Sequence, residues 1–143
     1  MLIYCMENIE ILDISGDLGI RVLAPTLEDI FVNAAVGFYS LTTAIDNVEP
    51  VTTVRVSVGE DSAERLLVAW LNELIYLFDT DRFIGKTVRI ESLSNNHVVA
   101  YVCGESFDTE RHECGFLIKA ATYHKLLLSK GSSGWTAEVI FDI

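Results

Sequence analysis

The amino-acid sequence predicts an α+β domain in which two helices pack on a mostly antiparallel β-sheet. Three observations predict it: two segments with apolar residues at helical spacing, an alternating strand between them, and a series of strand-like segments after the second helix. The order of elements is two strands, a helix, a strand, a helix and then many strands, which is typical of helices that cover antiparallel neighbours. The 143 residues contain no linker, repeat or low-complexity segment, so we expect one domain over residues 1–143.

The N-terminal part is expected to form two strands and then a helix. Strands at 10–14 and 19–24 flank a turn that contains Gly16 and Asp17. Thr26 is the expected N-cap of the first helix, and apolar residues recur at helical spacing as far as Leu41. One face of this helix should therefore belong to the core.

The central part is expected to form a half-exposed strand and the main core helix. Residues 51–58 alternate valine with polar residues, the pattern of a strand with one wet face. Asp61 and Ser62 should open the second helix, with Glu64 bonding back to a cap at Asp61. The apolar face of this helix is very wide as far as Phe78, which predicts burial on several sides.

The rest of the chain is expected to consist of strands. Turn-forming residues at 94–96 and at 131–134 are short enough to join antiparallel neighbours. The predicted strands are residues 87–93, 97–105, 116–123, 125–130 and 135–143.

Composition and charge exclude several classes of protein. Ten Lys and Arg stand against 21 Asp and Glu, a formal net charge of −11, which is the wrong sign for binding nucleic-acid phosphates. The apolar runs at 66–71 and 74–78 are far shorter than a membrane span, which needs about 20 residues. The N-terminus lacks the basic region of a signal peptide, so we expect a soluble, cytoplasmic protein. An acidic surface suits basic protein partners and divalent cations.

The first residues and the cysteines carry little functional signal. The periodic pattern begins after Met6, so residues 1–5 are expected to be a dispensable extension. Cys5, Cys103 and Cys114 are odd in number and lack C-x-x-C spacing, which favours reduced thiols over disulfides or a zinc site.

Three short stretches and two isolated histidines are candidates for chemistry. Residues 84–88, "IGKTV", end like a phosphate-binding loop, but Thr80 stands where that loop requires its first glycine. The segment 107–115 contains His112 and Cys114, which a metal site or a Cys–His nucleophile would use, although this close spacing favours an ordered polar loop. Asp79 and Asp81 can bind a cation or simply end a helix. His97 and His124, beside strands, are expected to be surface side chains or side chains with satisfied hydrogen bonds.

The C-terminal stretch "EVIFDI" ends a predicted strand on Asp142 and on the terminal carboxylate of Ile143. From the pattern alone, this pair of anions is expected to be a solvated strand end. Composition and residue spacing therefore indicate an acidic α+β domain and show no catalytic arrangement of residues.

Four longer stretches make the chain similar to the archease family. They are "LDISGDLGIRV", "WLNELIYLFDTDRF", "GESFDTERHECGFLIKAATYHKL" and "W..EVIFDI", which together span nearly the whole length in the family's order. Archeases assist RtcB-type RNA ligases, which join tRNA exon halves through a guanylylated histidine on the ligase. The resemblance therefore implies an accessory protein without catalytic residues of its own, whose partner is an RtcB-type RNA ligase.

The resemblance also implies a metal site. The family's N-terminal motif, usually His-Thr-Ala-Asp followed by Val or Ile and Gly, corresponds here to residues 14–19; Asp17 and Gly19 match and the histidine is missing. In the family this aspartate, the penultimate aspartate and the terminal carboxylate hold a calcium-like ion, which maps to Asp17, Asp142 and Ile143. Hard anionic oxygens suit Ca²⁺, and also Mg²⁺ or Mn²⁺. Asp13 is either a nearby supporting carboxylate or a plain strand end.

The function implied by the resemblance is activation of the ligase: promotion of GMP transfer from GTP to the ligase's histidine, over multiple turnovers. Two alternatives remain open at this point. One is a metal-dependent hydrolase that uses the same carboxylates with His112 as acid or base. The other is a general chaperone-like modulator of nucleic-acid-processing proteins.

Overall fold

The computed structural model describes residues 8–143, and of Ile14 the backbone only. The predictions that concern Cys5, the start at Met6 and the extension 1–5 lie outside these residues. Within them, the chain forms two helices and two antiparallel sheets in one domain, which confirms the predicted α+β class.

The strands divide into two separate sheets. One has the order β1-β2-β8-β6, with β7 also pairing β8, and the other has the order β3-β5-β4. All the pairings within residues 8–143 are antiparallel. The strands are β1 (Ile9–Ile14), β2 (Asp17–Ala24), β3 (Thr52–Gly59), β4 (Phe83–Leu93), β5 (His97–Ser106), β6 (Ala120–Ala121), β7 (Leu127–Gly131) and β8 (Gly134–Asp142).

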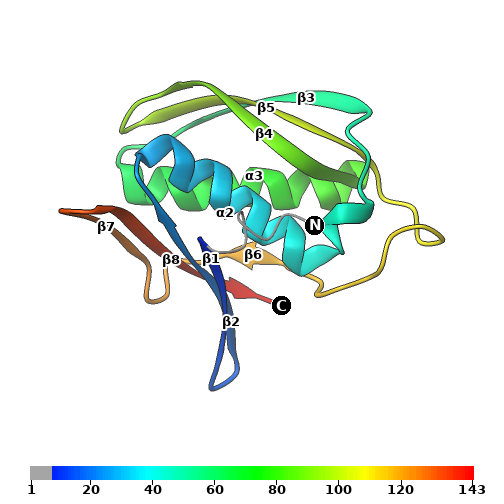
Figure 1. The fold of residues 1–143 in the computed structure, drawn as a ribbon, viewed down its shortest axis with the longest axis horizontal. Helices are drawn as coiled ribbons and strands as arrows, with labels where there is room; N and C mark the ends of the chain where they lie inside the picture. Colours follow the sequence, from blue (N-terminus) through cyan, green and yellow to red (C-terminus); the bar gives the residue numbers. More distant parts are fainter. Residues whose placement is uncertain (1–7) are drawn as a thin grey trace.

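Both helices lie between the two sheets (Figure 1). They are α2 (Leu27–Thr42) and α3 (Ala63–Asp81), and a short 3-10 turn, η1 (Ile45–Asn47), follows α2. Because each helix has a sheet above and below it, the apolar stripe of α3 has to be wide, as its sequence indicated. In residues 8–143 no helix combines the length and apolar character needed to cross a bilayer.

The helix caps confirm one prediction and correct another. The side chain of Thr26 accepts a hydrogen bond from the backbone N–H of Asp29 at 3.1 Å, as expected for an N-cap. The cap of α3 is Ser62, whose hydroxyl accepts from the N–H of Arg65 at 3.3 Å; the prediction that Asp61 is the cap was wrong. Asp61 lies one residue too early and instead pairs with the Arg65 side chain.

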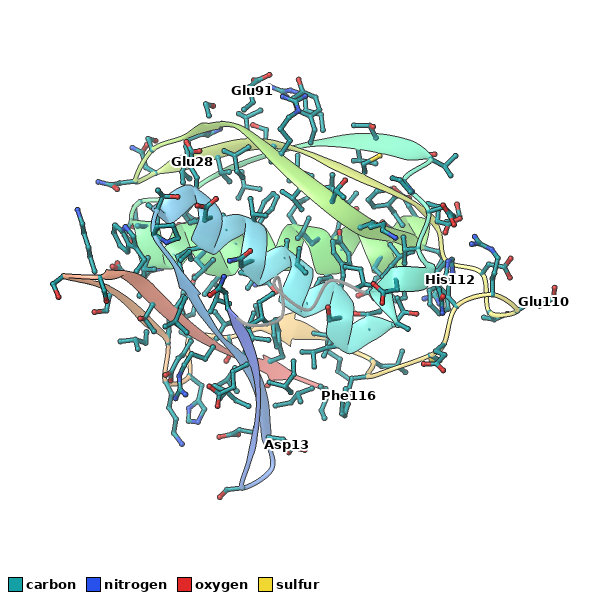
Figure 2. All side chains as sticks on the ribbon, in the orientation of Figure 1. Asp13, Glu28, Glu91, Glu110, His112 and Phe116 are labelled. Carbon is teal, nitrogen blue, oxygen red and sulfur yellow. The ribbon has the colours of Figure 1, made fainter. Side chains whose placement is uncertain are left out.

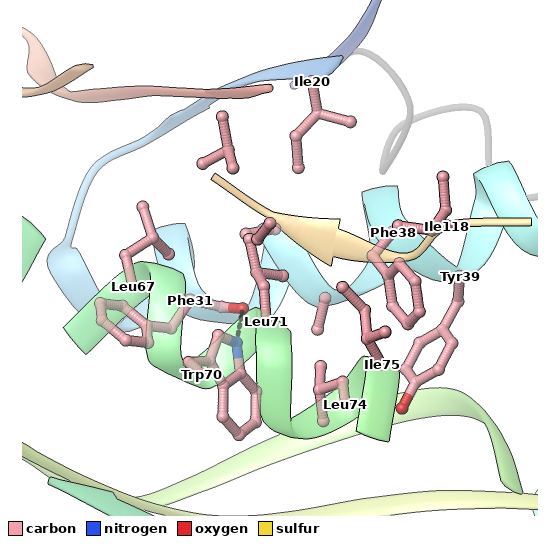
Figure 3. Packing of buried hydrophobic residues seen from close by; sticks show 14 of the residues in the cluster. Ile20, Phe31, Phe38, Tyr39, Leu67, Trp70, Leu71, Leu74, Ile75 and Ile118 are labelled. Carbon is pink, nitrogen blue, oxygen red and sulfur yellow. Dashed lines mark hydrogen bonds between the residues drawn. The ribbon is translucent and has the colours of Figure 1, made fainter. Parts of the chain in front are cut away.

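The core is centred on the contact between α2 and α3. Trp70 of α3 is fully buried, and its indole N–H donates to the carbonyl oxygen of Phe31 on α2 at 3.0 Å (Figure 3). This bond satisfies the one polar atom of the buried indole and fixes the two helices to each other. Tyr39 is also fully buried, and burial raises the pKa of its phenol.

The segment after β5 differs from its prediction. Residues 116–123 were expected to form one strand, but only Ala120–Ala121 does so. The N–H groups of Gly115 and Phe116 instead donate to the carbonyls of Thr42 and Leu41, at 2.8 and 2.9 Å. These bonds satisfy carbonyls that the end of α2 leaves without helical partners, and they place residues 115–116 against the end of α2.

Candidate functional site

The register of β2 and β8 brings together the two aspartates that the sequence singled out. The last pair of this ladder is Leu18 opposite Phe141, so Asp17 at the start of β2 and Asp142 at the end of β8 follow it at the same end. Ile143 is the next residue, and its side chain is exposed. Residues far apart in the sequence therefore meet at one exposed corner of the larger sheet.

Gly19 permits the close approach of the two strands at this corner. A Cβ atom at Gly19 would stand 2.4 Å from the carbonyl oxygen of Val139 on β8. Because that neighbour is backbone, a larger residue would push β2 away from β8. The match of Gly19 to the family motif thus has a steric reason.

The segment around β6 is tied to both β8 and α3. The N–H of Lys119 donates to the carbonyl of Asp142 at 2.8 Å, and the hydroxyl of Thr122 donates to the carbonyl of Ile140 at 2.8 Å. The side-chain amide of Asn72, on α3, bonds both the N–H and the carbonyl of Ala121, at 2.8 and 3.2 Å. These bonds fix where the following residues can lie.

His124 and Lys125 are placed beside Asp17 as a result. Nε2 of His124 lies 3.5 Å and Nζ of Lys125 lies 3.7 Å from Oδ2 of Asp17. Thr122 helps to fix this turn, since its hydroxyl accepts from the N–H of His124 at 3.2 Å. The sequence did not predict this contact. The only signal for it was that the conspicuous stretch "KAATYH" contains a basic group near the end of a strand.

A hollow of about 110 Å³ lies next to these groups, and both signs of charge line it. Asp17 and Lys125 form part of its wall, and the ion pair of Arg21 with Glu138 forms another part. Nε of Arg21 donates to Glu138 at 2.7 Å, and Nη1 donates to Glu10 at 2.9 Å, which raises the pKa of the guanidinium. This arginine is occupied by its neighbours, whereas Lys125 contacts Asp17 from a largely exposed position.

The residues at this corner suit a hard divalent cation. Within residues 8–143 no group of three or more His, Cys, Asp or Glu side chains is arranged to hold a metal. The predicted set contains two such side chains, Asp17 and Asp142, and its third member is the terminal carboxylate of Ile143. Asp13 lies opposite Leu18 in the β1–β2 ladder, so it belongs to the opposite face from Asp17 and is a strand-end carboxylate.

The His112 loop is a closed hydrogen-bond network. Nδ1 of His112 accepts from the backbone N–H of Asp108 at 2.8 Å, so the ring proton sits on Nε2 and is donated to Glu105 at 3.0 Å. Glu105 also accepts from Arg111 and from the N–H of Glu49. These bonds, with that from Arg111 the strongest, lower the pKa of Glu105 to about 2.

This network rules His112 out as a metal ligand or as the base of a Cys–His pair. Its side chain is fully buried and both ring nitrogens have partners, which confirms the expected ordered loop. Figure 2 shows His112 turned into the fold while Glu110 lies at the tip of the loop. Cys114 is exposed instead.

The other candidate stretches have structural explanations. The predicted turn at Asp79 and Asp81 is the last turn of α3, and the helix ends at Arg82, which has φ 55°. Residues two apart on a helix do not face each other, so this pair cannot share one ion. The "IGKTV" residues lie in β4, without a following helix. His97 is exposed and contacts the hydroxyl of Ser57 at 3.3 Å.

The structure thus defines a single-domain α+β protein with two helices between antiparallel sheets and a carboxylate corner where the start of β2 meets the end of β8. A solved structure with this fold is the solution structure of protein 1598 from Methanobacterium thermoautotrophicum. The TM-score is 0.81 at 29% identity, over 96% of this chain and 100% of that one. A crystal structure of an archease and possible chaperone from Thermotoga maritima has a TM-score of 0.62 at 17% identity, over 92% of this chain and 94% of that one, a likeness that concerns the fold alone.

Sequence comparison gives the family. The model of the Archease protein family (MTH1598/TM1083) matches residues 9–143, and the chain belongs to this family. Protein archease of Methanosarcina barkeri is 30% identical over 141 residues, 96% of this chain and 97% of that protein. Protein archease of Thermococcus gammatolerans is 35% identical over 133 residues, 90% and 94% of the two chains. The resemblance noted from the sequence is confirmed.

Proposed function

We propose that this archease is an accessory protein that activates an RtcB-type RNA ligase by promoting transfer of GMP from GTP to the ligase's histidine. Membership of the family supports this proposal, and the observation that carries it is the meeting of Asp17 and Asp142 at an exposed corner. With two carboxylates beside the terminal carboxylate, this carboxylate corner is a charged, exposed feature that can enter a partner's site. The proposal includes a cytoplasmic location and no direct RNA binding, in keeping with the net charge of −11.

The corner is proposed to hold a divalent cation, with Ca²⁺ favoured over Mg²⁺ or Mn²⁺. Asp17, Asp142 and the terminal carboxylate of Ile143 would be its ligands, since hard cations take anionic oxygens. Such an ion, when bound, would supply positive charge that can neutralise the phosphates of a triphosphate. Lys125 and His124 both lie within 4 Å of Oδ2 of Asp17, where they help to hold the position of this carboxylate.

The test is a guanylylation assay with the cognate ligase, GTP labelled in the α-phosphate, and this protein at substoichiometric amounts. Wild type should accelerate labelling of the ligase, while Asp17→Asn and Asp142→Asn should lose most of the acceleration, because each keeps its shape and loses its charge. Asp79→Asn is the matched control, since Asp79 lies on the last turn of α3. Equal rates with and without wild-type protein would overturn the proposal.

The two alternatives give different results in the same experiment. A hydrolase would turn over phosphoesters without the ligase, but the base that it required, His112, is buried with both ring nitrogens bonded. A general chaperone would suppress aggregation of unrelated proteins and leave the guanylylation rate unchanged.

A further inference from the structure

A second surface feature shares no lining residue with the hollow at the carboxylate corner: a groove of about 410 Å³ between β1, the end of α2 and residues 113–116. Its walls are largely apolar. Ile11 and Phe116 contribute large side chains that are 40% and 45% exposed, although most residues of this kind in the fold are buried. Figure 2 shows Phe116 and Asp13 at the periphery of the molecule, below α2. A volume of this size is within the range of binding pockets.

The groove runs along a strand edge that has no partner in the described part of the chain. In the described part of the chain, β1 pairs only with β2 and is an edge strand, so the groove runs beside an edge that can accept a further strand. Apolar walls beside an open strand edge are the features by which proteins bind extended segments.

The charge around the groove indicates the charge expected of the bound segment. Glu113 is the only Asp, Glu, Lys, Arg or His among its described lining residues. Asp13 adds a second carboxylate two residues along β1 from Ile11, on the same face of that strand. An apolar groove with an acidic rim complements an apolar side chain that is flanked by Lys or Arg.

We propose that this groove docks an extended segment of a protein partner, with an apolar side chain between Ile11 and Phe116 and an adjacent basic residue at Glu113. The inference rests on the proposed function in one respect, since it takes the RNA ligase as the partner. It assigns the docking contact to the groove and leaves the carboxylate corner at Asp17 and Asp142 free to enter the partner's site.

Binding of the cognate ligase, measured by biolayer interferometry, tests the groove separately from the carboxylate corner. Phe116→Ser and Glu113→Lys should each weaken binding about tenfold or more. Tyr76→Ser and Glu110→Lys are matched controls, because Tyr76 is an exposed aromatic residue on α3 and Glu110 lies in the same loop outside the groove lining. Both controls should bind like wild type, and thermal unfolding of all four variants checks the fold.

Cys114 provides a measurement that needs no variant. It is exposed and lines the groove, so a bound segment should slow its reaction with a maleimide about tenfold. The site of reaction is read by peptide mass spectrometry, with Cys103 as the internal reference, because it lies on β5 in the other sheet.

The outcomes separate the two proposals. If wild-type protein binds and activates the ligase, but the groove variants bind equally well and Cys114 reacts at the same rate, the groove inference is wrong and the proposed function stands. If wild-type protein neither binds nor activates, the proposed function fails. Removal of residues 1–5 that exposes Cys114 without any ligase would assign the groove to the chain's own N-terminus. Protection that rises with protein concentration would assign it to a second copy, and either result overturns the inference.

Discussion

Two acidic regions of this molecule look alike in the sequence and differ in the fold. In the network between Glu105, near the end of β5, and His112, in the loop that follows, each nitrogen of the buried imidazole is bonded, and the Glu105 carboxylate accepts three hydrogen bonds. At the corner formed by Asp17 and Asp142, the contacts to Asp17 are long and come from exposed bases, and Asp142 is exposed. Residue types capable of chemistry are thus used for stability in one region and remain accessible in the other.

The largest expected change in stability comes from a substitution that pushes β2 away from β8 at the carboxylate corner. Gly19→Ala should lower the free energy of unfolding by about 3 kcal/mol, because the added methyl group would stand 2.4 Å from a carbonyl oxygen of β8. Gly131→Ala is the control, since its added methyl group has its nearest neighbour at 3.8 Å. Urea denaturation measures both. An unchanged midpoint for Gly19→Ala would show that β2 and β8 need not approach so closely, and the corner would lose its steric explanation.

The next effect tests the claim that the loop is structural. His112→Ala should lower the free energy of unfolding by about 2 kcal/mol, because it leaves the N–H of Asp108 without its acceptor and removes a ring packed on Phe107. Its affinity for Ca²⁺, measured by calorimetry, should equal that of wild type. His97→Ala, at an exposed histidine, should change stability by less than about 0.5 kcal/mol. Loss of Ca²⁺ binding in His112→Ala would remove the distinction between the two regions.

The loop should also show its role in the pH dependence of stability. The pKa of Glu105 is about 2 in the fold, below the ordinary value of 4.5, so its contribution is complete above the ordinary value and disappears as the pH falls towards 2. Thermal unfolding of wild type and Glu105→Gln should therefore differ most near pH 7 and converge between pH 5 and 2. A difference that stays constant over this range would mean that the ionised carboxylate is not what holds the loop.

The smallest change in the stability of the metal-free protein is expected from a substitution at the carboxylate corner. Asp142→Asn should change stability without metal by less than about 0.5 kcal/mol, since an exposed carboxylate packs little. Added Ca²⁺ should raise the Tm of wild type and leave that of the variant nearly unchanged, because an ion that binds only the folded state stabilises it. A variant that melts several degrees lower in a chelator would show that Asp142 is structural, like Glu105.

The sequence predicted the elements better than their arrangement. The helices followed from apolar spacing and the Thr26 cap, which are local signals. The division into two sheets could not be predicted, because alternation along a strand says which face is buried and nothing about its neighbour. The predicted strand at 116–123 was wrong over most of its length, since Gly115 and Phe116 bond to the end of α2, a contact that depends on the folded chain.

The candidate site also has residues that the sequence indicated and residues that only the fold brings together. Asp17 and Asp142 were named from the resemblance, and the strand register places them at one corner. Their service as metal ligands, with Ile143, stays a prediction. The approach of His124 and Lys125 to Asp17 depends on the hydrogen bonds of Thr122 and Asn72, which connect residues far apart in the sequence and leave no pattern in it.

The bond between Trp70 and Phe31 has an optical consequence. Trp70 is wholly shielded from water, whereas Trp135, the other tryptophan, is only partly buried at the start of β8, with Nζ of Lys130 at 5.9 Å from its ring centre. The two indoles should therefore emit at different wavelengths, and an aqueous quencher such as iodide should reach only Trp135. Emission from Trp70 then reports melting of the helix pair, and emission from Trp135 reports opening of the β7–β8 hairpin, so the native chain carries its own two-colour readout of where unfolding begins.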